Sequence, residues 1–200
     1  MNELEKMRCS ELADMSAIEL QESFIHAKKL ISIRHTGVAD LDIVMSIYDH
    51  SRHKMRESGN MTQWVNGYPS RSIIAKDIDN GNSYVIVTEN GIIGVFTFII
   101  GEDPNYSTID GEWPDNSTYG TIHRIASAPG AHGIADIALD FCMKSGIDIR
   151  IDTHADNAPM LGWIAKRRFK YCGIIHVEDG TPRNAFIYRQ LQSSHKTKRC

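Results

Sequence analysis

A short loop of small residues has the clearest chemical meaning in this sequence. The segment YGTIHRIAS at 119–127 has the composition of a strand, APGAHG at 128–133 is the loop, and IADIALDFC at 134–142 has helical spacing. Small residues that open a helix leave several backbone N–H groups unpaired at the positive end of the helix dipole. Such a set of donors binds anions, and a diphosphate fits it.

Two familiar kinds of phosphate-binding loop do not match this segment. A Walker-type phosphate loop is excluded because no Gly-Lys-Ser/Thr follows, and the glycine triplet of a dinucleotide fingerprint is incomplete. A strand-to-helix turn with a purely structural purpose stays open when the loop is considered alone.

The strand-like segment before the loop carries a candidate base. Alternation along this segment predicts that Thr121, His123 and Ile125 share one face of a strand. A histidine accepts protons near neutral pH, and a placed base speeds a proton transfer by ~10²- to 10⁴-fold. We therefore expect His123 to act as a base or to hold a water molecule.

A second strand-like segment, DIRIDT, supplies two companions for His123. Asp152 lies at its end and His154 just beyond it, and we expect both to point toward the same opening as His123. Each of the three also fits a structural role. His50 and His53 lie three residues apart, but no third ligand is placed by the sequence, so we expect no metal site.

The remaining elements follow from hydrophobic periodicity and turn residues. Asn90-Gly91 between two β-rich runs predicts a hairpin. Residues 101–118 are polar and contain prolines, which indicates a surface excursion and not a core element. The expected order is a strand at 31–34, helices from Asp40 and over 71–79, strands at 83–88, 92–100 and 119–127, a helix from Gly133, a strand at 148–153, a helix over 157–168 and strands at 172–179 and 184–191.

Size, charge and cysteines restrict the class of protein. A chain of 200 residues with 42% hydrophobic residues can form one well-buried core, so we expect one domain. A net charge of −3 gives no broad cationic surface, so we expect no nucleic-acid partner. The four cysteines form no C-x-x-C pair, and no segment resembles a secretory signal or a membrane span, so we expect a cytoplasmic protein with no membrane partner.

The order of elements over 31–191 resembles the GNAT superfamily of acyl-CoA-dependent N-acetyltransferases. The family's diphosphate loop, Q/R-x-x-G-x-G/A, aligns with residues 130–135. Its later helix, N-x-x-A followed by Y-x-K-x-G-F, agrees at Asn157, Lys166 and Phe169. The segments HTGVADLD and QW-x-x-GYPS also resemble a group of uncharacterised bacterial GNAT proteins.

The resemblance implies an α/β (α+β) fold, a mixed, mostly antiparallel twisted sheet flanked by helices. The sheet would splay between the strands at 119–127 and 148–153, and acetyl-CoA would lie in the splay. Residues 31–191 would form the acyltransferase domain, preceded by an N-terminal helical extension at 1–30 and followed by a polar tail at 192–200. The extension packs either on its own domain or on another subunit, which leaves a homodimer open.

The resemblance also implies how acetyl-CoA is held. The backbone at Ile125 and Ser127 would pair with the pantetheine arm, much as an added strand pairs with a sheet edge, and Asn157 would contact the same arm. The loop would hold the diphosphate through Gly130, Ala131, His132, Gly133, Ile134 and Ala135. Because the loop lacks Arg and Lys and Asp136 follows it, we expect no charge assistance and a lower affinity for CoA.

For the acceptor, the resemblance implies an amine-binding side built from aromatic residues. These candidates, for which ordinary loop packing is an equal alternative, are Trp64, Tyr68, Trp113 and Tyr119. Asp152 aligns with the base of GNAT enzymes that modify protein N-termini, whereas Ile164 occupies the position of the usual tyrosine acid. The implied activity is direct acetyl transfer to a primary amine on a small molecule or peptide; the alternative is an acyl-CoA-binding pseudoenzyme or regulatory module without turnover.

Overall fold

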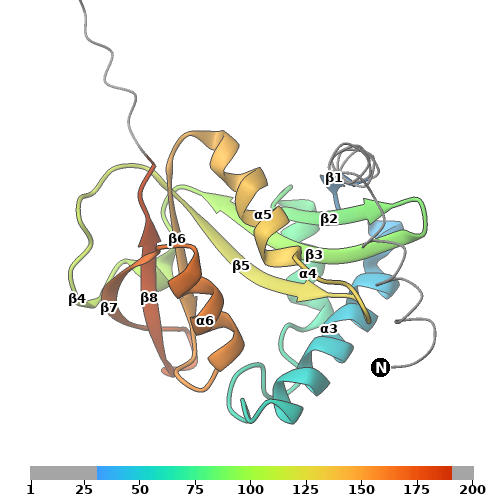
Figure 1. Ribbon diagram of the computed structural model, residues 1–200, viewed down its shortest axis with the longest axis horizontal. Coiled ribbons are helices and arrows are strands. Elements are labelled where there is room, and N and C mark those ends of the chain that lie inside the picture. The colour runs from blue at the N-terminus through green and yellow to red at the C-terminus, as the bar shows by residue number, and fades with distance from the viewer. Residues whose placement is uncertain (1–30, 191–200) are drawn as a thin grey trace, which may run out of the picture.

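An eight-stranded sheet forms the centre of the computed structural model, which describes residues 31–190 (Figure 1). The strands are β1 (Ser32–His35), β2 (Ser83–Thr88), β3 (Gly91–Ile100), β4 (Asp110–Gly111), β5 (Tyr119–Ser127), β6 (Asp148–Thr153), β7 (Lys170–His176) and β8 (Pro182–Tyr188). Their order is β1-β2-β3-β5-β6-β8-β7-β4, and only the β5–β6 pair is parallel. The predicted fold class is confirmed; the predicted extension and tail lie outside the described residues.

Helices cover both faces of the sheet. They are α3 (Leu41–Glu57), α4 (Arg71–Asp79), α5 (Ile134–Cys142) and α6 (Ala158–Lys166), with 3₁₀ turns η1 (Val38–Asp40), η2 (Pro104–Tyr106) and η3 (Met143–Ser145). One cluster joins α5 and α6 to Ile86 and Phe96, whereas the other joins α3 and α4 to Val85 and Val95. Neighbouring residues of one strand thus enter opposite cores, which explains why β3 is apolar along its length except at Thr97.

The first long helix begins without the side-chain cap expected from Asp40. Its carboxylate instead accepts hydrogen bonds from the Gly37 N–H at 2.8 Å and from Arg34 Nη1 at 2.6 Å. A 3₁₀ turn precedes the helix, so the carboxylate is directed backward onto this turn and onto β1. Asp40 therefore fixes the turn before the helix and does not pair with a helical N–H.

A bulge in β5 changes which side chains face the site. Val95 pairs with Ala126 and Thr97 pairs with His123, so β5 contains one extra residue between these pairs. Arg124 adopts a φ of 52°, in the left-handed region. The predicted alternation of Thr121, His123 and Ile125 is therefore wrong at its last position, because a bulge shifts the residues beyond it to the other face. Ile125 packs in the α5–α6 cluster.

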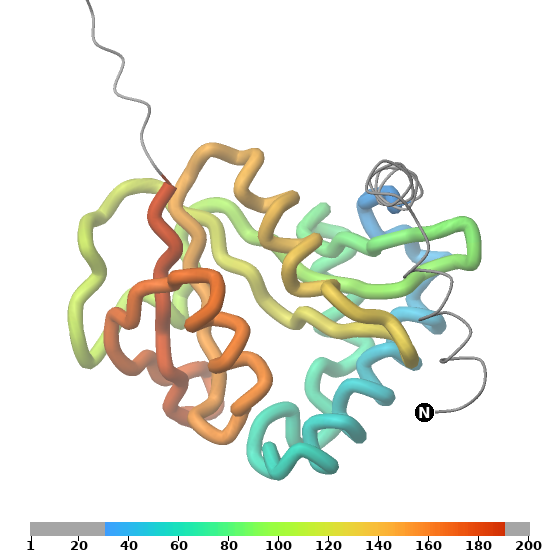
Figure 2. The backbone as a smooth tube through the Cα atoms, viewed as in Figure 1, coloured from blue at the N-terminus to red at the C-terminus, as the bar shows by residue number. Residues whose placement is uncertain are grey.

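The sheet splays where the sequence predicted. β5 and β6 pair only through residues 119–121 and 148–150, and beyond this point the two strands diverge (Figure 2). Within residues 31–190, no strand pairs with the remaining part of β5 on this side. A free strand edge thus faces the space between the two halves of the sheet.

The segment 101–118 is only in part the surface excursion expected. Tyr106 is 2% exposed and packs with Ile175 and Ala185 as a third core cluster. Asp103 is also buried. The polar composition of the segment gave no sign of this burial, because only the ring of Tyr106 packs against the β7–β8 pair, while most residues around it stay at the surface.

Candidate active site

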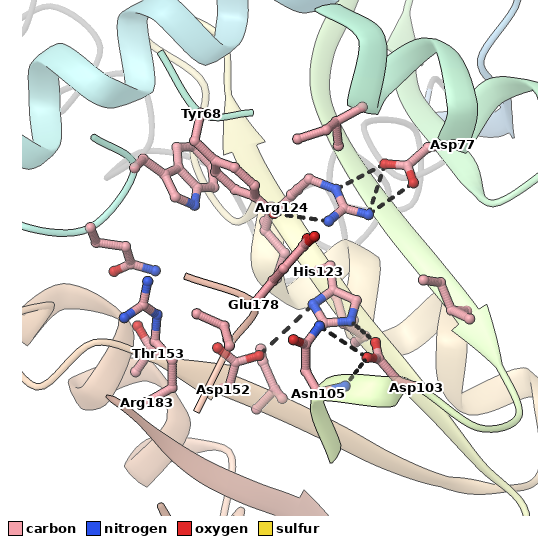
Figure 3. Close-up of a pocket in the computed structure, with 18 of the residues that line it drawn as sticks. Tyr68, Asp77, Asp103, Asn105, His123, Arg124, Asp152, Thr153, Glu178 and Arg183 are labelled. Atoms are coloured by element: carbon pink, nitrogen blue, oxygen red, sulfur yellow. Dashed lines mark hydrogen bonds and ion pairs between the residues drawn. The ribbon is translucent and has the colours of Figure 1, made fainter. Parts of the chain in front are cut away.

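A pocket of about 680 Å³ opens where β5 and β6 diverge (Figure 3). Its walls come from both strands, from the loop between α3 and α4, from the η2 segment and from the β7–β8 turn. A volume of this size suits a small-molecule site. Elements far apart in the sequence therefore contribute side chains to one cavity.

His123 lies between two carboxylates in this pocket (Figure 3). Its Nε2 lies 2.6 Å from Asp103 Oδ2, a hydrogen-bond distance, and its Nδ1 lies 3.8 Å from Asp152 Oδ1. Tyr106 donates its hydroxyl hydrogen to the same Asp152 oxygen at 2.6 Å. Four side chains from three separate segments thus form one polar array.

The protonation states of this array follow from its geometry. Burial opposes ionisation of Asp103, but the hydrogen bond and charge of His123 and the amide of Asn105 outweigh it, so the pKa of Asp103 lies below its usual value. Burial, and next the charge of Asp152, raise the pKa of Tyr106 well above its usual value, so its phenol remains a donor. Because an ionised carboxylate only accepts, Asp103 holds the proton on Nε2 and leaves Nδ1 of a neutral His123 as the basic nitrogen.

The two expected companions of His123 behave differently. Asp152 faces His123, as the sequence predicted. His154 does not: its Nε2 lies 3.0 Å from Thr62 Oγ1 and its Nδ1 lies 3.4 Å from Asp156. β6 ends at Thr153, so the chain has already turned toward α6 at the next residue. His154 therefore connects this turn to the loop before α4.

The loop expected to bind diphosphate is open and has free donors. Gly130 and Gly133 adopt φ values of 76° and 72°, and a Cβ added at either would meet no atom within 4 Å. Within residues 31–190, the N–H groups of residues 132–136 have no acceptor. Ala131 corrects the prediction, because its N–H donates to the Ala128 carbonyl at 3.0 Å to close the turn. The free donors therefore begin at His132 and extend into α5.

The negative charge of Asp136, just after the loop, is offset by a neighbouring cation. Asp136 accepts hydrogen bonds from Trp163 Nε1 and Arg167 Nε, each at 2.6 Å. Burial opposes ionisation of Asp136, but these two donors outweigh it and lower its pKa. Arg167, the residue that follows α6, therefore lies close to the loop but is paired with Asp136, so the expectation that CoA receives no charge assistance there stays a prediction.

The pantetheine-binding candidates also differ from one another. Ile125 and Ser127 lie on the part of β5 that has no strand partner toward β6. Asn157 lines the pocket, but its Oδ1 accepts from the Met160 N–H at 3.3 Å and its Nδ2 donates to Gln63 Oε1 at 3.0 Å. Asn157 thus caps α6 and anchors the loop before α4.

Of the four aromatic candidates, the structure brings two to the pocket. Trp64 and Tyr68 line it, and Tyr68 accepts a hydrogen bond from Arg124 Nη1 at 3.0 Å. Trp113 and Tyr119 do not line it. Their rings enclose the Arg150 guanidinium, whose central carbon lies 3.9 and 3.6 Å from the two ring centres. These two rings stabilise a buried cation.

Sequence patterns missed several residues of the site. Asp103, Tyr106, Asp77 and Arg183 all contribute to the pocket or its supports. Arg124 binds Asp77 through two hydrogen bonds, of 2.8 and 2.9 Å, which fixes the bulge of β5 to α4. The only local signal was Asp103-Pro104-Asn105, a turn sequence whose first side chain accepts from the Asn105 N–H at 3.0 Å.

Two negative findings apply to the described part of the chain. No group of three or more His, Cys, Asp and Glu side chains within residues 31–190 is arranged to hold a metal ion. In the same residues, no helix has both the length and the apolar character needed to cross a bilayer.

Solved structures of GNAT-family acetyltransferases have this fold. No family model and no curated protein matches the sequence. An acetyltransferase of the GNAT family from Streptococcus agalactiae matches at 29% identity with a TM-score of 0.71, over 81% of this chain and 96% of its own. One from Listeria monocytogenes matches at 20% identity with a TM-score of 0.62, over 80% and 94%. N-acetylglutamate synthase from Neisseria gonorrhoeae, complexed with coenzyme A and N-acetylglutamate, matches at 15% identity with a TM-score of 0.50, over 81% and 35%.

The splayed sheet, the open loop and these matches define an acyltransferase. The chain belongs to the GNAT superfamily of acetyltransferases. Among these three structures, only the first is similar enough in sequence to support more than the fold.

Proposed function

We propose that the protein transfers an acetyl group from acetyl-CoA to a primary amine by direct attack. One observation carries this proposal: β5 separates from β6 after Thr121, and His123 lies just beyond this point with a carboxylate on each side. A thioester placed along the free edge of β5 would lie next to a base. The Neisseria gonorrhoeae neighbour with coenzyme A bound supports this choice of acyl donor.

The residues present fit acetyl-CoA. The free N–H groups of 132–136 would hold the diphosphate at the positive end of α5. The edge of β5 at Ile125 and Ser127 would pair with the pantetheine amides. Thr153 supports a polar ligand here, because it lines the pocket, is 1% exposed, and its Oγ1 has no hydrogen-bond partner in the described residues.

In this mechanism His123 removes the proton of the amine. An ammonium group near neutral pH must lose a proton before it attacks, and Nδ1 of His123 accepts it directly or through one water molecule. Asp103 and Asp152 stabilise the imidazolium that forms. The amine nitrogen then bonds to the thioester carbon and releases its second proton to water, the C–S bond breaks, and the thiolate takes up the proton held by His123 or one from water.

The residue at the position of the family's tyrosine acid, Ile164, cannot protonate the leaving thiolate. Ile164 is 1% exposed and packs in the α5–α6 cluster, so it neither donates a proton nor faces the pocket. Departure of the thiolate therefore depends on its own low basicity and on His123. The backbone N–H groups of the free β5 edge would stabilise the oxyanion.

The test is thiol release from acetyl-CoA across a panel of primary amines, with His123→Ala as the variant. We expect turnover to fall ~10²-fold or more with little change in CoA affinity. His53→Ala is the matched control, because this histidine is 73% exposed on α3 and should leave turnover unchanged. CoA binding without any turnover would instead indicate a pseudoenzyme.

A further inference from the structure

Arg183 is a buried cation that has no acidic partner in the described structure. It lies on β8, lines the pocket and is 8% exposed. Its Nη1 donates to the Pro182 carbonyl at 3.0 Å. Within residues 31–190, no carboxylate oxygen lies within 4 Å of its guanidinium, and its other N–H groups have no acceptor. Most of its five donors therefore remain available.

Two other arginines with little exposure, Arg124 and Arg150, both have partners that stabilise their charge. Arg124 forms a two-bond ion pair with Asp77, and Arg150 lies between the rings of Trp113 and Tyr119. A buried charge is costly unless it is paired, so each of these cations has a compensating partner in the fold. Arg183 lacks one, which indicates that an anionic ligand supplies it.

The strand register places Arg183 beside the acid–base array. Ala185 pairs with Asp152, and Arg183 pairs with Ile175, so these side chains share the sheet face that also contacts Tyr106. Arg183 and Asp152 are diagonal neighbours on adjacent strands, a Cα separation of about 7–8 Å. A small molecule can span this separation.

The anion is not expected to come from CoA. The free donors at 132–136 begin α5, which packs on the opposite sheet face together with α6. The two faces are separated by the thickness of the sheet. The diphosphate and the partner of Arg183 therefore lie on different sides of the site.

Other charges near Arg183 do not satisfy it. Asp179 also lines the pocket, but its Oδ1 accepts from the N–H and hydroxyl of Thr181 at 2.9 and 2.5 Å. These bonds lower the pKa of Asp179 and hold it in the β7–β8 turn. Asp152 is occupied by Tyr106 and faces His123. Arg183 is thus a buried cation of the pocket without an acidic partner in the described residues, and it lies on the same sheet face as Asp152, whereas Lys76, which also lines the pocket, is exposed to solvent.

We propose that Arg183 binds a carboxylate on the acceptor while the amine of the same molecule is directed to His123 and Asp152. The acceptor class is an amine that carries a carboxylate a few bonds away: an amino acid, or a lysine at the C-terminus of a peptide. A guanidinium binds a carboxylate through two parallel hydrogen bonds, which fixes the orientation of the ligand. This inference rests on the proposed acetyl transfer, whose site it extends.

The experiment compares acceptors that differ only in the carboxylate. L-lysine is paired with cadaverine, and a peptide ending in lysine is paired with its C-terminal amide. In the wild-type protein, kcat/KM should be about 10- to 100-fold higher for the acceptor with the carboxylate than for its partner without it, in at least one of the two pairs. Arg183→Gln should remove this preference by raising KM, Arg183→Lys should restore part of it, and CoA affinity should be unchanged in both.

A binding measurement keeps the test independent of turnover. Titration of the CoA complex with L-lysine and with the lysine peptide should give a signal in the wild type that Arg183→Gln abolishes, even if no acetyl group moves. Arg34→Gln is the control, since this arginine lies on β1 outside the pocket and pairs with Asp40. Such binding without turnover would contradict only the proposed function. Equal kcat/KM or equal binding with and without the carboxylate, or a loss of CoA affinity in Arg183→Gln, would overturn the inference.

Discussion

The two halves of the sheet on either side of the splay are built differently. The half that contains β1, β2, β3 and β5 has a large apolar cluster on each face. In the other half, the apolar cluster on the face toward the site has three buried residues, Tyr106, Ile175 and Ala185, and this face also carries polar groups and Arg150 between two aromatic rings. Thus the first half, with two large cores, has a free strand edge and a loop with unpaired N–H groups, whereas the second half contributes charged and polar side chains to the site.

From this difference we expect the two halves to bind different ligands. Backbone groups of the first half suit a ligand that every member of the superfamily shares, because they recognise amides and phosphates without special side chains. Side chains of the second half suit an acceptor that differs between members. Substitutions in each half test this division, from the largest expected effect to the smallest.

Gly133→Glu tests the anion-binding side of the first half. The added side chain would enter the open space beside the free N–H groups and place a negative charge where the diphosphate is proposed to lie. We expect CoA binding to be lost in a direct titration. Gly146→Glu is the control, because Gly146 has a matching φ of 73°, is equally open and lies after α5. Normal CoA binding in Gly133→Glu would remove the loop from the site.

Two matched isoleucine truncations compare the cores of the two halves. Ile86 and Ile175 are both fully buried, the first in the α5–α6 cluster and the second in the small third cluster. Ile86→Ala should lower the free energy of unfolding by about 4 kcal/mol and Ile175→Ala by about 2 kcal/mol, since a small cluster can relax more around a cavity. Urea denaturation measures both values. Equal losses would mean that the halves are equally packed.

Asp103→Asn tests the polar array at the junction. An amide can donate as well as accept, so it no longer fixes the proton of His123 on Nε2, and we expect turnover to fall about 10- to 100-fold. Because the pKa of Asp103 is lowered in the folded protein, its contribution to stability is present above about pH 4 and is lost as the pH falls through the folded-state value. Acid titration of the unfolding free energy should therefore show a smaller decline in the variant. An identical decline would place the titrating group elsewhere.

Arg168→Gly tests a backbone detail of the family pattern, with the smallest effect. Arg168 follows α6 at the position where the pattern has glycine, and it adopts a φ of 60°. A glycine removes the steric cost of this left-handed conformation, so the free energy of unfolding should rise by about 1 kcal/mol. Thermal denaturation detects this gain as a higher midpoint. An unchanged midpoint would show that the arginine side chain offsets its backbone cost.

Local patterns were sufficient for most of the elements and for the position of the small-residue loop before α5. The Asn90-Gly91 hairpin, the helix over Arg71–Asp79 and the strand over Tyr119–Ser127 lie where hydrophobic period and turn residues placed them. The later boundaries were less accurate, since β7 and β8 begin two residues earlier than expected. These features depend on neighbours a few residues away, which a single sequence displays directly.

The composition of the site was decided by contacts that no local pattern contains. Asp103 meets His123 across 20 positions, and Arg167 meets Asp136 across 31. The bulge at Arg124 moved Ile125 to the other face, and the turn after β6 carried His154 away from His123. Each outcome depends on the order of strands and on one extra residue in a ladder, both of which are fixed only when the sheet assembles.

The sequence by itself determined the succession of most strands and helices, the position of the small-residue loop before α5 and the presence of His123 and Asp152 at one opening. Tertiary structure decided which charges surround that histidine and left Arg183 without an acidic partner in the part of the chain described. The physical reason is that backbone conformation responds to nearby residues, whereas the pairing of buried charges depends on which distant strands become neighbours.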